Sequence, residues 1–329
     1  MIGHAPATVP LRNIFLHVTR ACNLRCSYCY LAAGQASRAE LSAATLARLW
    51  PQVVAVRPQK VVFTGGEPLL RPDLCALLEG LKLADPEHLV LRCLNTNGLL
   101  MTREWAQALV PLADEVRVSM DALRERNDRL RDKGSFDAAV RALDTLYAAG
   151  FEPIAMVTVT RAGLADLEEL LAFLLERRIT RVHLNPFRAI GRGAACGDWA
   201  VAPQEVRAAL DRIRERLFPG QPPAGAPQTE CMNCGIGSFL NVLPEGDVFP
   251  CHVLATPAFR LGNVSEHSLS EMCAAGGPLG QLQSLDFRQP VDAGPGREPL
   301  VKLGTCLGTV YREAGVLGIS SPGLPLLAG

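Results

Sequence analysis

Three cysteines, Cys22, Cys26 and Cys29, lie close together near the N-terminus with the spacing C-x3-C-x2-C. Three thiolates on one short loop can bind three irons of a four-iron cluster and leave the fourth iron without a protein ligand. That open iron can bind a substrate or a cofactor. A zinc loop is the alternative, but a structural zinc site needs a fourth Cys or His, and His17 is predicted to point from within a strand.

A second group of cysteines, Cys231, Cys234 and Cys251, lies in the C-terminal third of the chain. The chain has 11 cysteines in all. An odd number argues against a disulfide framework and favours metal or redox chemistry in a reducing compartment. A Cys-x2-Cys pair followed by a third cysteine suits either an iron–sulfur cluster or a zinc ribbon. The two groups therefore predict two metal sites.

The charge balance excludes partners that require a strongly charged surface. Lys+Arg and Asp+Glu both total 33, so no global field attracts nucleic acid or an anionic membrane. The N-terminus lacks the charged start and apolar run of a secretory signal, and no stretch of about 18 apolar residues follows to span a bilayer. We expect a cytoplasmic protein with neither nucleic acid nor a membrane as its partner.

Strands and helices alternate along the chain before the second cysteine group. Short runs rich in β-branched residues predict strands at 14–19, 60–64, 89–95, 115–120, 153–160 and 181–186. Helical periodicity lies between and after them, at about 42–56, 72–83, 102–112, 136–149, 164–178 and 203–217. This alternation predicts an α/β fold with a parallel sheet, closed in part as a (β/α)6 barrel.

Ligands of such folds gather at the carboxyl ends of the strands. Polar and glycine-rich segments follow the strands as this rule requires: GGEP after the second, NTNG after the third and residues 119–121 at the end of the fourth. The Pro- and Gly-rich segment 219–228 marks a linker, and FLNVLPEGDVFPC predicts a hairpin beyond it. We therefore expect two domains, residues 1–218 and 219–329.

The segment CNLRCSYC resembles the cluster-binding loop of the radical S-adenosylmethionine (SAM) superfamily, with Tyr28 as the aromatic residue before the last cysteine. The resemblance implies that the amino and carboxylate groups of SAM chelate the open iron. Electron transfer from the cluster then releases a 5′-deoxyadenosyl radical, which abstracts hydrogen from a substrate. It also implies a reducing partner such as flavodoxin or ferredoxin.

The same resemblance implies which residues face SAM. The two glycines of TGGEP would bring backbone close to the methionine moiety, Glu67 would help receive the amino group, and Arg131 would lie near the carboxylate. Each polar residue alone is as well explained by a helix cap or a solvated loop. The complete set implied for cofactor binding is Tyr28, Gly65, Gly66, Glu67, Asn97, Ser119 and Arg131.

The second cysteine group resembles the start of the SPASM and Twitch domains that follow many radical SAM barrels. SPASM domains hold two auxiliary four-iron clusters and Twitch domains hold one. The downstream SPASM cysteine pattern is largely missing here, and only Cys306 matches it. We therefore expect one auxiliary cluster, bound by Cys231, Cys234, Cys251 and Cys306, and two four-iron clusters in the whole chain. If Cys306 is not a ligand, the auxiliary site has an open iron. A zinc ribbon is the alternative for this site.

Two classes of enzyme fit these motifs. A small-molecule enzyme would epimerise or dehydrogenate a carbinol of a carbohydrate or cyclitol, with Cys196 and Cys306 as candidate hydrogen-atom donors. A peptide-modifying enzyme would act on a ribosomal precursor. The first strand begins near residue 13, which leaves no room for a preceding peptide-binding domain, so we expect a small-molecule substrate. A metal-binding interaction module, the third reading, would make the SAM-facing motifs coincidental.

Overall fold

The computed structural model describes residues 11–219, 237–274 and 276–283. Within these ranges nine strands form one sheet in the order β6-β5-β4-β3-β2-β1-β7-β8-β9. The strands are β1 (Asn13–Thr19), β2 (Lys60–Gly65), β3 (Leu91–Thr96), β4 (Glu115–Ser119), β5 (Ile154–Val159), β6 (Arg181–Pro186), β7 (Phe239–Val242), β8 (Asp247–Phe249) and β9 (Gly262–Asn263). Strands β1 to β6 are parallel. This is the predicted α/β architecture, a partial (β/α)6 barrel followed by a small C-terminal unit, and each of the six predicted barrel strands is confirmed.

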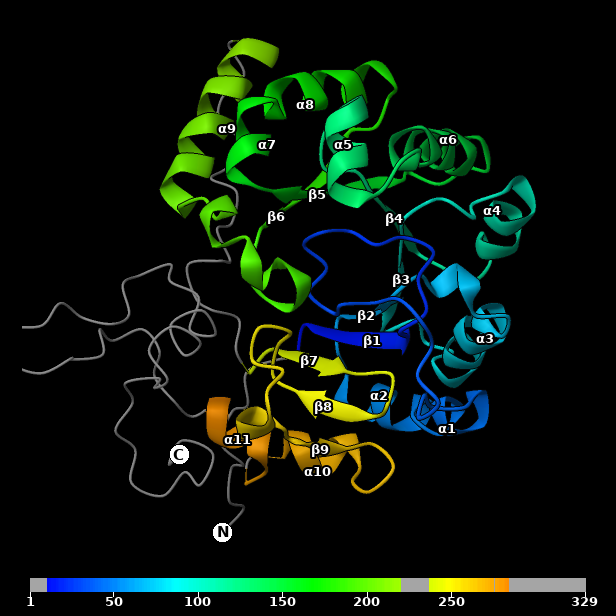
Figure 1. Cartoon of the computed structure of the whole chain (residues 1–329). Helices are drawn as coiled ribbons and strands as arrows, with labels where there is room; N and C mark the ends of the chain where they lie inside the picture. Colours follow the sequence, from blue (N-terminus) through cyan, green and yellow to red (C-terminus); the bar gives the residue numbers. More distant parts are fainter. Residues whose placement is uncertain (1–10, 220–236, 275, 284–329) are drawn as a thin grey trace, which may run out of the picture.

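Helices cover the outer side of the curved sheet, and the loop that follows β1 lies on its inner side (Figure 1). They are α1 (Ala43–Ala47), α2 (Trp50–Val56), α3 (Leu74–Ala84), α4 (Arg103–Leu109), α5 (Arg124–Arg131), α6 (Ser135–Ala148), α7 (Arg161–Ala165), α8 (Leu167–Glu176), α9 (Pro203–Leu217), α10 (Leu269–Cys273) and α11 (Pro278–Gln283). None of the helices in the described ranges is both long and apolar enough to cross a membrane.

Two predicted helices are each split into two. The segment at 42–56 forms α1 and α2, and the break precedes Pro51 in the first turn of α2. Proline has no N–H to donate to the preceding turn, so a helix cannot run through it undisturbed. The segment at 164–178 forms α7 and α8, with Thr160 capping α7 through a hydrogen bond from the Gly163 N–H.

The two faces of the sheet differ in composition. Alternate residues of each strand, such as Leu16 of β1 and Phe63 of β2, join the apolar core beneath the helices. Because successive side chains of a strand point to opposite faces, His17 and Thr64 face the inner side. Polar side chains on that face are the ones that can serve a binding site within the barrel.

Charged residues tie the first residues of three strands together at the amino ends of the barrel. Glu115 accepts hydrogen bonds from Lys60 at 3.0 Å, from Arg181 at 2.8 Å and from Arg117 at 2.5 Å. Burial alone would raise the pKa of Glu115, but Arg117 and Lys60 hold it well below its usual range. The network occupies the amino ends of the strands, opposite the ends at which ligands of such folds bind.

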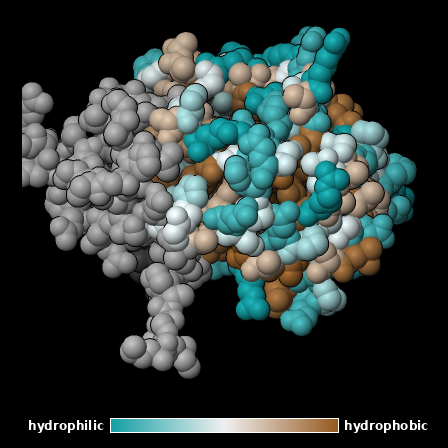
Figure 2. All heavy atoms as spheres, turned by 90° about the horizontal axis from the view of Figure 1, so that it is seen from below, coloured by the Kyte–Doolittle hydropathy of each residue, from teal (hydrophilic) through white to brown (hydrophobic). Residues whose placement is uncertain are grey.

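The C-terminal strands continue the barrel sheet. β7 pairs in parallel with β1, and β8 and β9 follow it in antiparallel order. The predicted hairpin is confirmed, with Gly246 at a φ of 91° in its turn. The division into residues 1–218 and 219–329 stays a prediction. On the face of the molecule in Figure 2, hydrophilic and hydrophobic residues are interspersed across the coloured atoms.

Candidate active site

The segment 20–34, here called the cysteine loop, is closed at its base by backbone hydrogen bonds. The Cys22 N–H donates to Gly34 O at 2.9 Å, and the Gly34 N–H donates to Arg20 O at 2.8 Å. The loop leaves the carboxyl end of β1 and returns to it. The three cysteines therefore lie on a closed loop at the carboxyl ends of the strands, where the sequence predicts that ligands bind.

The three thiols of this loop are half-buried and close enough to affect one another. Burial raises the pKa of Cys22, and Cys29 adds to the rise. Burial also raises the pKa of Cys26 to about 11, and Cys22 and Cys29 both add to that rise. Backbone N–H groups donate to Cys22 Sγ and to Cys29 Sγ, both at 3.4 Å. Such donors stabilise sulfur when it is a thiolate ligand.

These residues fit a four-iron cluster better than a single metal ion. Among the described residues, no group of three or more His, Cys, Asp or Glu side chains is arranged around one ion. In a cluster each thiolate binds a different iron, so its ligands lie farther apart than those of one zinc ion. Partial exposure of all three thiols leaves them accessible to a cluster.

Tyr28 and Arg131 meet at a buried carboxylate. Arg131 forms a two-point ion pair with Asp121, with Nε–Oδ2 at 2.5 Å and Nη2–Oδ1 at 3.0 Å, and the Tyr28 hydroxyl donates to the same Asp121. The Arg131 guanidinium also lies 5.5 Å from the centre of the Tyr28 ring. Burial would lower the pKa of Arg131, but Asp121 raises it well above its usual range. This trio fastens the cysteine loop to the carboxyl end of β4.

Gly65 and Gly66 bring the end of β2 against the start of the cysteine loop. The Gly66 N–H donates to Thr19 O at 2.7 Å. A Cβ at position 66 would lie 2.0 Å from Ala21 O, and one at position 65 would lie 2.4 Å from Thr19 O. The close approach of these two backbones thus requires glycine at both positions. This requirement is separate from the predicted approach of the glycines to SAM.

Glu67 and Asn97 connect the ends of β2 and β3 to the loop. Glu67 is fully buried and accepts from Thr96 Oγ1 at 2.8 Å and from the Asn97 N–H at 2.7 Å. The Asn97 side chain donates to Asn23 Oδ1 at 2.7 Å and lies 3.9 Å from Cys22 Sγ. Glu67 therefore holds Asn97 beside the first cysteine.

Ser119 and Cys196 lie at two further edges of the site. Ser119 ends β4, is half-buried, and has no side-chain hydrogen bond to a described residue. Cys196 is half-buried at the end of the 3-10 helix Gly191–Ala195. Arg192 of that helix donates to Cys26 O at 2.8 Å and to Ala33 O at 2.7 Å. Arg192 is thus an anchor of the cysteine loop.

The C-terminal hairpin contacts the cysteine loop near both of its ends. Arg20 forms a two-point ion pair with Glu245, with Nε–Oε1 at 2.5 Å and Nη2–Oε2 at 3.0 Å. Tyr30, directly after the third cysteine, packs on His252 with ring centres 5.3 Å apart. His252 follows Cys251 in the chain, so this ring pair joins the segments that carry Cys29 and Cys251.

Sequence reasoning did not assign these loop contacts. Arg20 pairs with Glu245 across 225 positions, and Tyr28 donates to Asp121 across 93 positions. No local spacing or periodicity indicates such contacts. Of the predicted auxiliary ligands, Cys251 is half-buried and accepts from the Leu254 N–H at 3.4 Å. The predicted ligands Cys231, Cys234 and Cys306 lie outside the described residues.

Comparison with known protein families agrees with this geometry. The family model for the Radical SAM superfamily matches residues 16–185, and the one for the SPASM iron–sulfur cluster-binding domain matches residues 231–290. The chain belongs to the radical SAM superfamily. As a member of this superfamily, it binds SAM and a four-iron cluster in the barrel. Its SPASM domain binds auxiliary iron–sulfur clusters.

Relatives of known name include maturases and enzymes of other kinds. "Mycofactocin maturase MftC" of Mycobacterium tuberculosis (strain CDC 1551 / Oshkosh) is 33% identical over 264 residues, which cover 75% of this chain and 66% of that protein. "Fe-coproporphyrin III synthase" of Methanosarcina barkeri is 32% identical and covers 61% of this chain and 50% of that protein. The chain thus spans slightly less than two thirds of the first of these relatives.

Solved structures share the fold. Streptococcus suis SuiB bound to SAM has a TM-score of 0.66 at 17% identity, over 84% of this chain and 69% of that one. The protein anSMEcpe with bound SAM has a TM-score of 0.65 at 19% identity, over 83% of each chain. At 17–19% identity these structures show a shared fold and nothing about the substrate of this chain.

Proposed function

We propose that this radical SAM enzyme is a maturase that modifies a precursor peptide. The observation that carries the proposal is the extent of the match to proteins named maturases. That match covers 75% of the chain and cannot fit within the barrel alone. Matches to the Fe-coproporphyrin III synthase and to a probable GTP 3′,8-cyclase of Methanopyrus kandleri cover only 61% and 64%. The likeness to the maturases therefore includes the C-terminal unit.

In this proposal Cys22, Cys26 and Cys29 hold the SAM-binding cluster, and Cys251 joins Cys231 and Cys234 at an auxiliary cluster. When bound, the first cluster supplies an electron to SAM, and the reactive chemistry belongs to these cofactors. The chain contributes a closed loop that fixes the three thiols at the carboxyl end of β1.

The residues around the loop have separate tasks in SAM binding. The Ser119 hydroxyl is available to donate to a polar group of SAM. Asn97, held by Glu67, presents its amide next to Cys22. Arg131 and Tyr28 are already paired with Asp121, so they position the loop and need not touch SAM directly.

The proposal is tested with reduced, reconstituted enzyme and the short peptides encoded next to its gene. We expect 5′-deoxyadenosine to form and one such peptide to change in mass, both measured by liquid chromatography and mass spectrometry. The variant with Cys22, Cys26 and Cys29 all replaced by Ala serves as the control and should give neither product. Conversion of a carbohydrate or cyclitol, with every peptide unchanged, would refute the proposal.

The same reaction in deuterated water separates epimerisation from oxidation. Epimerisation needs a hydrogen atom delivered to the substrate carbon, and Cys196 and Cys306 are the candidate thiol donors. An epimerase should place one solvent deuterium in the product, and Cys196→Ala or Cys306→Ala should abolish this incorporation without preventing SAM cleavage. A product that lacks two hydrogens and carries no deuterium at the reacting carbon would establish oxidation and leave both thiols without this task.

A further inference from the structure

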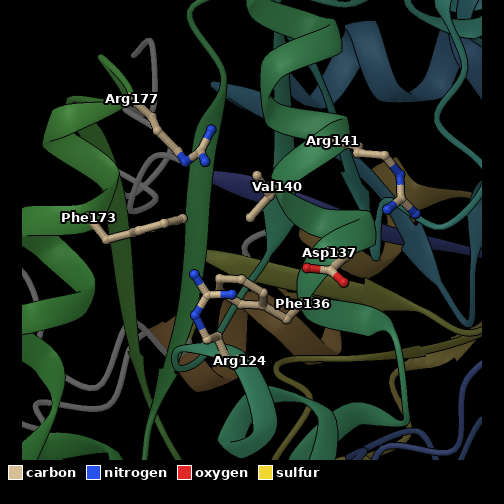
Figure 3. Close-up of a pocket in the computed structure, with 7 residues that line it drawn as sticks. All are labelled: Arg124, Phe136, Asp137, Val140, Arg141, Phe173 and Arg177. Carbon is tan, nitrogen blue, oxygen red and sulfur yellow. The ribbon is translucent and has the colours of Figure 1, made fainter.

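A groove lined by arginine and phenylalanine side chains lies on the outer side of the barrel. Phe173 and Arg177 extend from α8 toward α6, and Arg124 and Phe136 lie near the start of α6 (Figure 3). Its volume of about 190 Å³ is below the roughly 300–1,000 Å³ of typical small-molecule sites. It therefore suits side chains of a protein partner better than a cofactor. The lining residues are Arg124, Phe136, Asp137, Val140, Arg141, Phe173 and Arg177.

Aromatic rings hold two of these arginines in place. The Arg124 guanidinium lies 5.6 Å from the centre of the Phe136 ring, and that of Arg177 lies 4.8 Å from the centre of the Phe173 ring. The two rings pack on each other with centres 5.6 Å apart. Cation–π contacts of this kind restrict a long side chain before any partner arrives, which lowers the entropic cost of binding.

The positive charges of the groove are incompletely balanced. Arg177 pairs with Asp144 at 3.1 Å, whereas neither Arg124 nor Arg141 forms an ion pair with a residue of the described ranges. Arg124 has a φ of 39° and is the first residue of α5. A positive φ is unfavourable for arginine, and a cation at a helix N-terminus opposes the helix dipole. Features that cost stability in this way are typical of functional positions.

Helix α5 connects the groove to the cysteine loop. Arg124 begins this helix, and at its other end the Leu130 carbonyl accepts from the Ser27 N–H at 3.0 Å. The next carbonyl, that of Arg131, lies 3.7 Å from Cys26 Sγ. The helix has 8 residues, which corresponds to a length of about 12 Å. A redox centre at the groove would thus be separated from the loop by one short helix.

We propose that this groove is the docking site of an acidic protein that donates single electrons to the SAM-binding cluster. The inference rests on the proposed function, because cleavage of SAM consumes an electron that must be replaced. In each encounter the donor protein loses one electron and the cluster gains one, and no bond is made or broken. Carboxylates of the donor pair with Arg124 and Arg141, and their attraction speeds the encounter.

The test follows reduction of the cluster in the reconstituted full chain, with reduced flavodoxin as the acidic donor. We expect Arg124→Glu and Arg141→Glu together to lower the second-order rate constant about tenfold or more, and added salt to slow the unmodified protein. Arg103→Glu makes a similar charge change at an exposed position on α4 and should have little effect. Binding of flavodoxin to cluster-free protein, measured by biolayer interferometry, should weaken in the same variants.

Reduction by dithionite separates docking from the properties of the cluster. The groove variants should be reduced by dithionite at the unmodified rate. An equal loss with Arg103→Glu, or a flavodoxin rate independent of salt and of Arg124, would overturn the proposal. Slower peptide conversion with unchanged flavodoxin reduction would assign the groove to the peptide and also overturn it. If the unmodified protein reduced by dithionite cleaves no SAM and changes no peptide, the proposed function itself fails.

Discussion

Glu67 is a buried carboxyl group whose protonation is coupled to folding. Burial raises its pKa to about 7, although hydrogen bonds from Asn97, Leu69 and Thr96 lower it in part. A folded pKa above the unfolded one means that the fold favours the protonated form. The stabilisation is therefore complete below pH 4.5, the usual pKa of the group, and is lost as the pH rises through about 7.

We expect this coupling to make the free energy of unfolding depend on pH, and we expect Glu67→Gln to remove that dependence. In cluster-free protein, the free energy of unfolding of the wild type should fall by about 3 kcal/mol relative to Glu67→Gln as the pH rises from about 4.5 to about 8. Urea denaturation at several pH values measures both proteins. Glu79→Gln, at an exposed position of α3, should keep the wild-type slope. Equal slopes for wild type and Glu67→Gln would contradict the buried carboxyl.

Arg131 illustrates what the sequence can and cannot predict about a single residue. The motif predicts an arginine near the cofactor, and the structure places this side chain behind Tyr28 of the cysteine loop. Its two-point ion pair with Asp121 joins a strand end to a helix end. Nothing in the spacing of the two residues indicates that pair, because ion pairs between separate elements depend on the three-dimensional packing.

Among the helices of the barrel, α5 is the one that sequence periodicity missed. The buried residues of its face are Asn127 and Arg131, which are polar, so a search for apolar residues at helical spacing does not find it. The barrel strands were predictable because each carries a dense run of β-branched and apolar residues. The helix breaks near Pro51 and Asp166 depend on local capping that periodicity does not resolve.

The two glycines after β2 control how closely this element approaches the cysteine loop. Gly66→Ala would place a methyl group 2.0 Å from Ala21 O, so one of the two backbones must move. We expect a loss of about 2–3 kcal/mol in stability and less iron per chain after reconstitution. Gly197→Ala is the matched control, because no atom lies within 4 Å of the added methyl group. Full iron content in Gly66→Ala would show that the loop tolerates the displacement.

The ion pair between Arg20 and Glu245 fastens the hairpin element to the loop. Both side chains are about one quarter exposed, at 30% and 24%, so we expect only about 1 kcal/mol from the pair. Arg20→Glu and Glu245→Arg should each speed hydrogen exchange in residues 20–34, measured by mass spectrometry. The double variant restores opposite charges and should recover part of the protection. Absence of any recovery would mean that the pair does not hold the loop.

At the scale of the whole molecule, the Tyr30–His252 ring pair joins the segments that carry Cys29 and Cys251, one predicted ligand of each cluster. We expect anaerobically reconstituted protein to contain two four-iron clusters, or about eight irons per chain. Replacement of Cys22, Cys26 and Cys29 together should leave about four. Iron analysis and electron paramagnetic resonance measure both proteins. Three clusters would restore a full SPASM ligand set, and zinc at the second site would exclude an auxiliary cluster there.

The pairing of β7 with β1 has a consequence for folding while the ribosome synthesises the chain. Arg20 and Glu245 are 225 positions apart, and β1 lacks its neighbour β7 until residue 239 and beyond have emerged. At a synthesis rate of about 5–20 residues per second, that interval lasts about 10–45 s. The three cysteines thus leave the ribosome long before their loop can acquire its final contacts. Iron delivered before then would meet an unfinished site, so productive loading belongs after the C-terminal hairpin has emerged.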